Sequence, residues 1–120
     1  MVADMNADTM QIGEVAERTQ LSIRTIRHYD QVGLVPPSGR SDGGFRLYTA
    51  EDVTRLNYVR WITPLGFSLE ETAEILRLIE GAEDQSQLAD YLARAQASRD
   101  KMARKLRQAD ELIDVLKRLS

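Results

Sequence analysis

The stretch from Ser22 to Gly33, SIRTIRHYDQVG, most constrains what this chain can fold into, because its spacing separates two helix faces with different properties. Ile23, Ile26 and Tyr29 recur every three residues, so on a helix they share a flank that packs inward. The opposite flank carries cationic and hydrogen-bonding side chains at i, i+3, i+4 and i+7, namely Arg24, Arg27, His28 and Gln31. No acid interrupts this flank, and the spacing predicts a helix suited to lying against DNA.

Both ends of this helix are marked in the sequence. Ser22 is a good N-cap, whose hydroxyl can accept from a free amide of the first turn, and Gly33 suits the left-handed position after the last turn. Just upstream, residues 12–19 (IGEVAERT) read as a short helix, and residues 19–21 make the connection. Helix, three-residue turn and helix together form the pattern of the DNA-binding helix-turn-helix.

Residues 34–49, LVPPSGRSDGGFRLYT, predict a small hairpin. Two prolines and three glycines exclude a helix here, and the FRLY segment alternates as a short strand does. A tight turn over residues 41–44 would join two extended arms. Arg40 and Arg46 then lie near the start and end of the hairpin, in position to reach a DNA backbone as a wing.

Two capped helices follow the hairpin. Thr49 and Asp52 form a capping-box-like start to a helix that Pro64 stops. Its expected inward stripe is Val53, Leu56, Val59 and Ile62. Ser68 and Glu71 form a second capping box, opening a helix that ends before Gly81. One side of that helix carries Leu69, Ala73, Leu76 and either Ile79 or Glu80.

The last third of the chain, residues 82–120, contains neither glycine nor proline and predicts one long helix whose start Asp84 or Ser86 can cap. Apolar residues step alternately by four and three along it: Leu88, Leu92, Ala95, Met102, Leu106, Ala109, Ile113 and Leu116. Arg99 interrupts this heptad seam, either as a register device or as a long side chain that snorkels past the crossing point. A rod of about 50 Å cannot bury its whole stripe on a body of ~80 residues. We therefore expect an antiparallel coiled coil with a second copy, and hence a homodimer.

Composition excludes several functional classes. The chain has 120 residues, a net charge of −3 and no cysteine, so it can form neither a disulfide nor a thiolate metal site. With a single histidine and no glycine-rich phosphate loop or nucleophile elbow, we expect no enzyme activity, no cofactor and no metal site. No signal peptide or apolar run long enough to span a membrane is present, and the expected location is the cytoplasm, at the nucleoid.

Four linked motifs resemble the MerR family of bacterial transcription regulators: IGEVA, SIRTIRHYDQVGLVPP, GGFRLYTAEDV and LGFSLEETAEIL, in this order and spacing from Ile12 to about Leu76. The resemblance implies a mainly α-helical winged helix-turn-helix fold with a small β wing. It places Ser22, Arg24, Thr25, Arg27, His28 and Tyr29 at the recognition helix and Arg40, Gly44, Phe45, Arg46 and Tyr48 in the wing. His28 departs from the tyrosine or phenylalanine that is usual in the family.

The resemblance also implies a mechanism and a division of the chain. Homodimers of the family bind the spacer of a promoter and distort it so that RNA polymerase engages both promoter elements. Three segments are expected: a disordered tail at 1–9, a winged helix-turn-helix domain with its second helix pair at 10–81, and an antiparallel coiled-coil dimerisation helix at 82–120. An organic effector held by the dimer, or no effector at all, would suit a chain without cysteine.

Several residues have alternatives that the sequence leaves open. Arg24 and Arg27 are either DNA contacts or solvated surface, and Tyr29 is either core or a phosphate contact. Arg40 and Arg46 either bind phosphates or form a salt bridge with Asp42 or Asp52. The aromatic side chains Tyr58, Trp61 and Phe67 either line an effector pocket or pack at a helix junction. For the whole chain, the alternatives are a DNA-architecture or interaction module without promoter-specific control and, last, an enzyme-associated adaptor without a DNA role.

Overall fold

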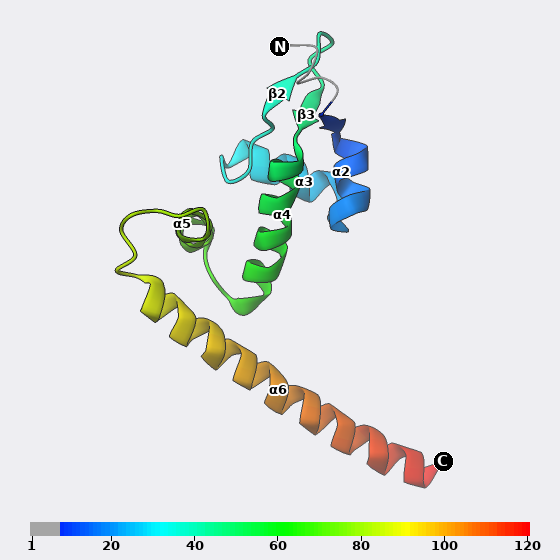
Figure 1. Ribbon diagram of the computed structural model, residues 1–120. Helices are drawn as coiled ribbons and strands as arrows, with labels where there is room; N and C mark the ends of the chain where they lie inside the picture. The colour runs from blue at the N-terminus through cyan, green and yellow to red at the C-terminus, as the bar shows by residue number, and fades with distance from the viewer. Residues whose placement is uncertain (1–7) are drawn as a thin grey trace. The chain divides into compact units, whose positions relative to one another are not determined.

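The computed structural model describes residues 8–120, so residues 1–7 of the expected N-terminal tail lie outside the described part (Figure 1). The chain is mainly helical and carries a small three-stranded sheet, which confirms the expected fold class. The elements in chain order are β1 (Met10–Gln11), α2 (Ile12–Thr19), α3 (Ile23–Gln31), β2 (Gly39–Arg40), β3 (Arg46–Tyr48), α4 (Ala50–Ile62), the 3-10 turn η1 (Thr63–Leu65), α5 (Leu69–Ile79) and α6 (Leu88–Leu119). No helix in the described range 8–120 is long and apolar enough to cross a membrane.

Internal contacts divide the chain into two units, one up to Leu76 and one from Arg77 to Ser120. The boundary falls within α5 and lies a little before the expected domain boundary at 81/82. Each unit is described by itself. The first holds the helix-turn-helix, the sheet and α4, and the second consists mainly of α6.

The core of the first unit takes its buried residues from α2, α3, the segment before β2, β3, α4 and α5. Its buried members are Val15, Ile26, Tyr29, Val35, Tyr48, Leu56, Val59, Ile62 and Leu76. The inward flank of α3 was therefore predicted correctly for Ile26 and Tyr29, but wrongly for Ile23, which is 38% exposed at the first position of the helix. Such burial contributes about 1.5–3 kcal/mol for each large apolar side chain.

The end of α2, where the turn of the helix-turn-helix begins, is held by its own hydrogen bonds and by a bond from α4. Gln20 ends α2 in the left-handed conformation (φ +61°), and its N–H donates to Ala16 O at 2.9 Å. The buried Thr19 hydroxyl donates to Val15 O at 2.8 Å. From α4, Arg60 Nη1 donates to Thr19 O at 2.7 Å. These bonds fix the end of α2 and tie it to α4.

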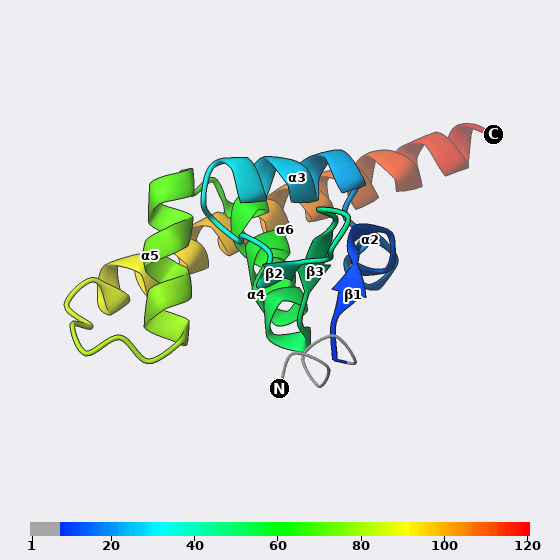
Figure 2. The same cartoon turned by 90° about the horizontal axis from the view of Figure 1, so that it is seen from above.

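The sheet has the strand order β1–β3–β2, with both pairs antiparallel, and Figure 2 shows the three strands beside one another. The pair β2–β3 is the expected hairpin, in which Arg40 lies opposite Arg46. The outer strand β1 comes from the residues just before α2, where Met10 pairs with Tyr48. This third strand ties the base of the hairpin to the start of the helix-turn-helix.

Both expected capping boxes are confirmed. Thr49 Oγ1 accepts from Asp52 N at 3.2 Å and Asp52 Oδ2 accepts from Thr49 N at 2.9 Å. The pair Ser68 and Glu71 repeats this pattern at 3.1 and 2.9 Å. Pro64 lies in η1 directly after the last residue of α4, so the expected stop is also correct.

The inward faces of the two capped helices differ in how well the sequence predicted them. All four residues of the expected α4 stripe are buried or pack against the core. In α5 the expected side is only partly right, because Leu76 is buried but Leu69 and Ile79 are exposed. Thr72 takes the second buried position, where its hydroxyl donates to Ser68 O at 2.8 Å.

Helix α6 contains 32 residues, which corresponds to about 48 Å. The expected side-chain cap is wrong, because Gln87 occupies the N-cap position and makes no side-chain cap bond. Asp84 instead accepts from Ser86 N at 3.0 Å within the preceding loop. This backbone hydrogen bond, together with one from the Ser86 side chain, lowers the pKa of the Asp84 carboxyl.

Candidate nucleic-acid interface

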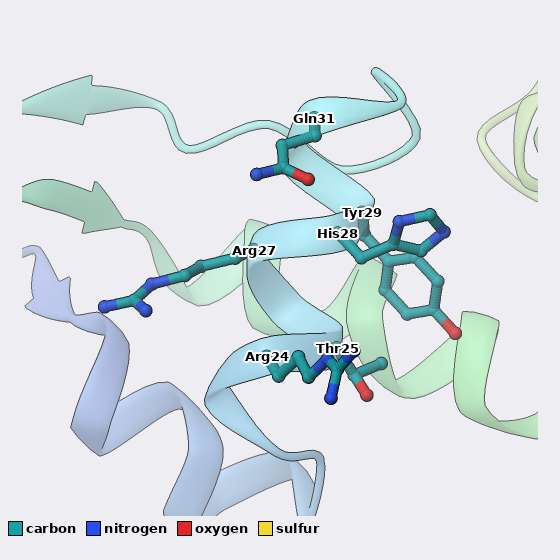
Figure 3. A pocket seen from close by; sticks show the side chains of 6 residues that line it. All are labelled: Arg24, Thr25, Arg27, His28, Tyr29 and Gln31. Atoms are coloured by element: carbon teal, nitrogen blue, oxygen red, sulfur yellow. The ribbon is translucent and has the colours of Figure 1, made fainter.

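The outer face of α3 presents its side chains to solvent as the sequence spacing predicts. Ser22 caps the helix, with its Oγ accepting from Thr25 N at 3.0 Å. The face forms a hollow lined by Arg24, Thr25, Arg27, His28, Tyr29 and Gln31 (Figure 3). Within residues 8–120, neither Arg24 nor Arg27 is engaged in an ion pair. Their cationic groups are therefore available for an external acceptor.

Figure 3 shows how these side chains divide the face of α3. Arg27 extends to one side of the helix, whereas His28 and Tyr29 lie together on the other. The two rings have centroids 5.9 Å apart and planes tilted by 46°. Tyr29 is only 9% exposed, and burial raises the pKa of its phenol. It is thus a core residue that also forms part of the wall of the hollow, so both roles considered from the sequence remain compatible.

The wing turn is built as expected over residues 41–44. Gly44 N donates to Ser41 O at 2.9 Å, and Ser41 N donates to Phe45 O at 2.9 Å. Gly44 has φ +83°, a left-handed conformation that side chains other than glycine adopt only with strain. Phe45 follows with 63% of its surface exposed. The hairpin therefore holds one large aromatic side chain out in solvent at its tip.

Both wing arginines reach the acid of α3. Arg46 Nε donates to Asp30 Oδ2 at 2.7 Å, and Arg40 Nη2 lies 3.5 Å from the same oxygen. The salt bridge considered from the sequence therefore exists, but its acid is Asp30, and neither Asp42 nor Asp52. Asp52 pairs with Arg55 at 3.2 Å within α4.

Tyr48 differs from the other expected wing residues because it has no exposed surface. Its hydroxyl is buried and has no hydrogen-bond partner among the described residues. Burial is the main cause that raises the pKa of this phenol, and Asp30 adds to it. In this conformation Tyr48 is a core residue, and we leave it out of the proposed interface.

A Tyr48→Phe variant tests this assignment. Because the hydroxyl is buried without a partner, its removal should leave the free energy of unfolding unchanged or raise it by up to about 1 kcal/mol. DNA affinity should stay within about twofold of the wild type. Urea unfolding and fluorescence anisotropy measure the two quantities. A large loss of affinity with intact stability would show that the hydroxyl reaches DNA after all.

Sequence reasoning missed the residues that hold this surface in place. Asp30 is absent from the sequence-based site, because its partners Arg40 and Arg46 lie ten and sixteen residues away along the chain. Ser38 donates to Asp52 Oδ2 at 2.6 Å and so joins the start of the wing to α4. Arg60 holds the helix-turn-helix turn from α4. No periodicity links such distant residues, so only the fold reveals them.

The fold and this surface define a winged helix-turn-helix DNA-binding protein, and comparison with known proteins identifies its family. The family described as MerR HTH family regulatory protein matches residues 10–79. The chain belongs to the MerR family of transcriptional regulators, whose members are not known as enzymes. The protein is therefore a DNA-binding regulator of transcription.

Individual relatives support this membership along most of the chain. The chain is similar to the HTH-type transcriptional regulator HmrR of Rhizobium leguminosarum bv. viciae, with 39% identity over 110 residues, 92% of this chain and 83% of that protein. It is 39% identical over 101 residues to the mercuric resistance operon regulatory protein of Serratia marcescens, covering 82% and 69%. Among solved structures, the N-terminal part of the multidrug transporter activator Mta from Bacillus subtilis matches with TM-score 0.57 and 33% identity, covering 91% and 95%.

Proposed function

We propose that the protein binds a promoter as a homodimer and controls transcription by distorting the DNA between two half-sites. Each copy would place α3 in a major groove, where Arg24 and Arg27 read base edges. The wing residues Arg40 and Phe45 would contact the adjacent backbone. RNA polymerase would then respond indirectly, through the altered DNA, at the nucleoid in the cytoplasm.

The observation that carries this proposal is the unpaired arginine face of α3. A solvated surface normally mixes charges of both signs, whereas here two arginines, a histidine and an amide lie together and the helix's own acid turns to the wing. The protein as a whole carries net charge −3, so indiscriminate attraction to DNA is weak. A local cationic face on an acidic protein favours a particular DNA site over bulk DNA.

The second support is the apolar seam of α6. Six of its large members are exposed in the single chain, namely Leu88, Leu92, Met102, Leu106, Ile113 and Leu116. Exposed apolar side chains at heptad spacing are stabilised by packing against a second helix of the same pattern. A two-fold pair of chains would present two recognition helices, which matches a two-fold DNA site.

Signal sensing would differ from that of a thiolate metal sensor. One relative is named for mercuric resistance, but this chain has no cysteine to bind a soft metal ion. We infer that any effector is an organic molecule. The aromatic pair of Tyr58 and the 59% exposed Trp61, with ring centroids 5.3 Å apart and edge to face, offers a surface for one.

Fluorescence anisotropy on a duplex from the region upstream of the protein's own gene tests the proposal. At about 150 mM salt the wild type should bind this duplex about a thousandfold more tightly than scrambled DNA. Equal weak binding to both duplexes would contradict promoter-specific control. It would favour an architectural DNA-binding role instead.

The Arg27→Ala variant tests the role of the α3 face in that binding. Loss of one base-reading arginine should weaken specific binding about ten- to a hundredfold and leave weak binding to scrambled DNA much less affected. Arg107→Ala, which removes an equal charge from an exposed position of α6 outside the seam, is the matched control. Equal losses in both variants would mean that α3 contributes only general charge.

A further inference from the structure

We propose that Asp30 is a positioning residue for DNA recognition: it fixes the two wing arginines to the recognition helix, so that wing and helix meet the duplex as one surface. This inference rests on the proposed DNA interface and adds a role for a residue that does not itself face the DNA-binding hollow. Asp30 lies in the last turn of α3, whereas Arg40 and Arg46 come from β2 and β3.

The contact geometry supports a shared anchor. One oxygen, Asp30 Oδ2, accepts from Arg46 Nε at 2.7 Å and lies 3.5 Å from Arg40 Nη2. The Asp30 side chain is 15% exposed and that of Arg46 is 23% exposed, so solvent screens this pair less than a surface ion pair. A short charge-assisted hydrogen bond in such a place restricts both side chains.

The Asp30 anchor positions those guanidinium N–H groups of Arg40 and Arg46 that it does not itself contact. Asp30 engages Arg46 through Nε, and the terminal N–H groups of a guanidinium extend beyond that bond. Arg40 also donates through Nη1 to Gly44 O at 3.2 Å, in the wing turn, and its side chain is half exposed. With one edge of each guanidinium held, its other N–H groups can donate to a phosphate without a search among side-chain rotamers.

The wing needs such an anchor because its own strands are short. The β2–β3 pair consists of two residue pairs, and a hairpin of this size is marginally stable in isolation. Strand β1 holds the base of β3, but the Asp30 contacts connect the hairpin directly to α3. Without them, the wing would move relative to the helix that reads the bases.

Electrostatic repulsion and positioning predict opposite effects on DNA binding when the Asp30 charge is removed. A carboxylate near phosphate groups repels them, so simple electrostatics predicts that removing its charge strengthens DNA binding. Positioning predicts the reverse sign, because the freed arginines lose their fixed geometry. Asp42 provides the matched comparison, since it is an exposed acid in the wing turn, close to the same surface.

The test compares Asp30→Asn, Asp30→Glu and Asp42→Asn with the wild type, by anisotropy on the upstream duplex at fixed salt. We expect Asp30→Asn to weaken binding about tenfold, while Asp30→Glu recovers much of the loss because it retains the charge. Asp42→Asn should bind as tightly as the wild type or up to about threefold more tightly. Binding by Asp30→Asn that equals or exceeds that of the wild type overturns the proposal.

A readout in the free protein separates this proposal from the DNA-binding proposal. In ¹⁵N NMR spectra, the Arg46 Nε–H should exchange slowly with water in the wild type and rapidly in Asp30→Asn, while urea unfolding confirms that the variant folds. Rapid exchange in the wild type overturns the anchor whatever the DNA data show. Failure of the wild type to prefer its upstream duplex contradicts the proposed function, whereas slow exchange lost in Asp30→Asn still supports the anchor.

Discussion

Leu106→Glu is expected to convert the proposed dimer into a monomer and to remove tight binding to the proposed two-half-site operator. Leu106 is 64% exposed in the single chain and lies near the middle of the α6 seam. In an antiparallel pair, residues near the middle of both helices lie close together, so the two introduced carboxylates would be desolvated near one another. The loss of apolar burial and the like-charge repulsion act in the same direction.

The effect on DNA binding should exceed that of any single contact residue. A dimer binds its second half-site as an intramolecular event, which raises overall affinity by about 10²–10⁴ over a single half-site. A monomer loses this gain even though every arginine of α3 is still present. We therefore expect about a thousandfold weaker binding to the upstream duplex, compared with ten- to a hundredfold for Arg27→Ala.

Light scattering after gel filtration measures the first effect and anisotropy the second. The wild type should have a mass near 27.2 kDa, twice the 13.6 kDa of one chain, and Leu106→Glu should have a mass near 13.6 kDa. Ala97→Glu adds the same charge on the opposite side of α6, outside the seam, and should remain dimeric. A dimeric Leu106→Glu protein, or a wild type that is monomeric at micromolar concentration, would contradict the proposed interface.

Local patterns in the sequence were sufficient wherever neighbouring residues decide the outcome. The α3 face follows from helical spacing, and the boxes at Thr49 and Ser68 follow from a cap residue with an acid three positions later. The turn before Phe45 follows from its glycines. Each depends on residues within one or two turns of chain, which is the range over which sequence periodicity carries information.

The errors in the helix assignments have equally local causes. Ile23 continues the three-residue spacing of the inward flank, but it is the first residue of α3 and is 38% exposed, so the buried part of this flank begins one turn later at Ile26. On α5, Thr72 is buried because its hydroxyl bonds to Ser68 O, a partner that hydrophobic patterning ignores. Asp84 bonds within its loop and not at the start of α6, because the helix begins later than its sequence suggests.

Contacts between distant segments were beyond the reach of sequence patterns. The anchor of Arg46 on Asp30 and the bond from Arg60 to Thr19 connect residues that share no period. The sequence analysis correctly gave a wing salt bridge as an alternative. It named Asp42 and Asp52 as the acids, whereas the partner is Asp30. The arrangement of α3 against the hairpin decides which carboxylate is close, and that arrangement is a property of the tertiary fold.

Asp52→Ala should produce the largest loss of stability among the polar substitutions considered. The side chain is 1% exposed, and its two oxygens accept from three groups: Thr49 N at 2.9 Å, Ser38 Oγ at 2.6 Å and Arg55 Nη1 at 3.2 Å. Truncation removes the capping box of α4 and leaves partly buried donors without this acceptor. Loss of a cap costs about 1 kcal/mol and each buried unsatisfied donor about 1–3 kcal/mol, so we expect a total near 3 kcal/mol.

Urea unfolding at one fixed protein concentration measures this loss, because stability and dimerisation are linked. Glu51→Ala removes the neighbouring exposed acid of the same first turn, and it should cost at most about 0.5–1 kcal/mol through the helix dipole alone. Asp52→Asn should fall between the two, since its amide oxygen can still accept one bond. If Asp52→Ala lies within about 0.5 kcal/mol of the wild type, the bond from Ser38 does not hold the wing to α4. The hairpin would then be held to the rest of the first unit by strand β1, the Asp30 anchor on α3 and the core.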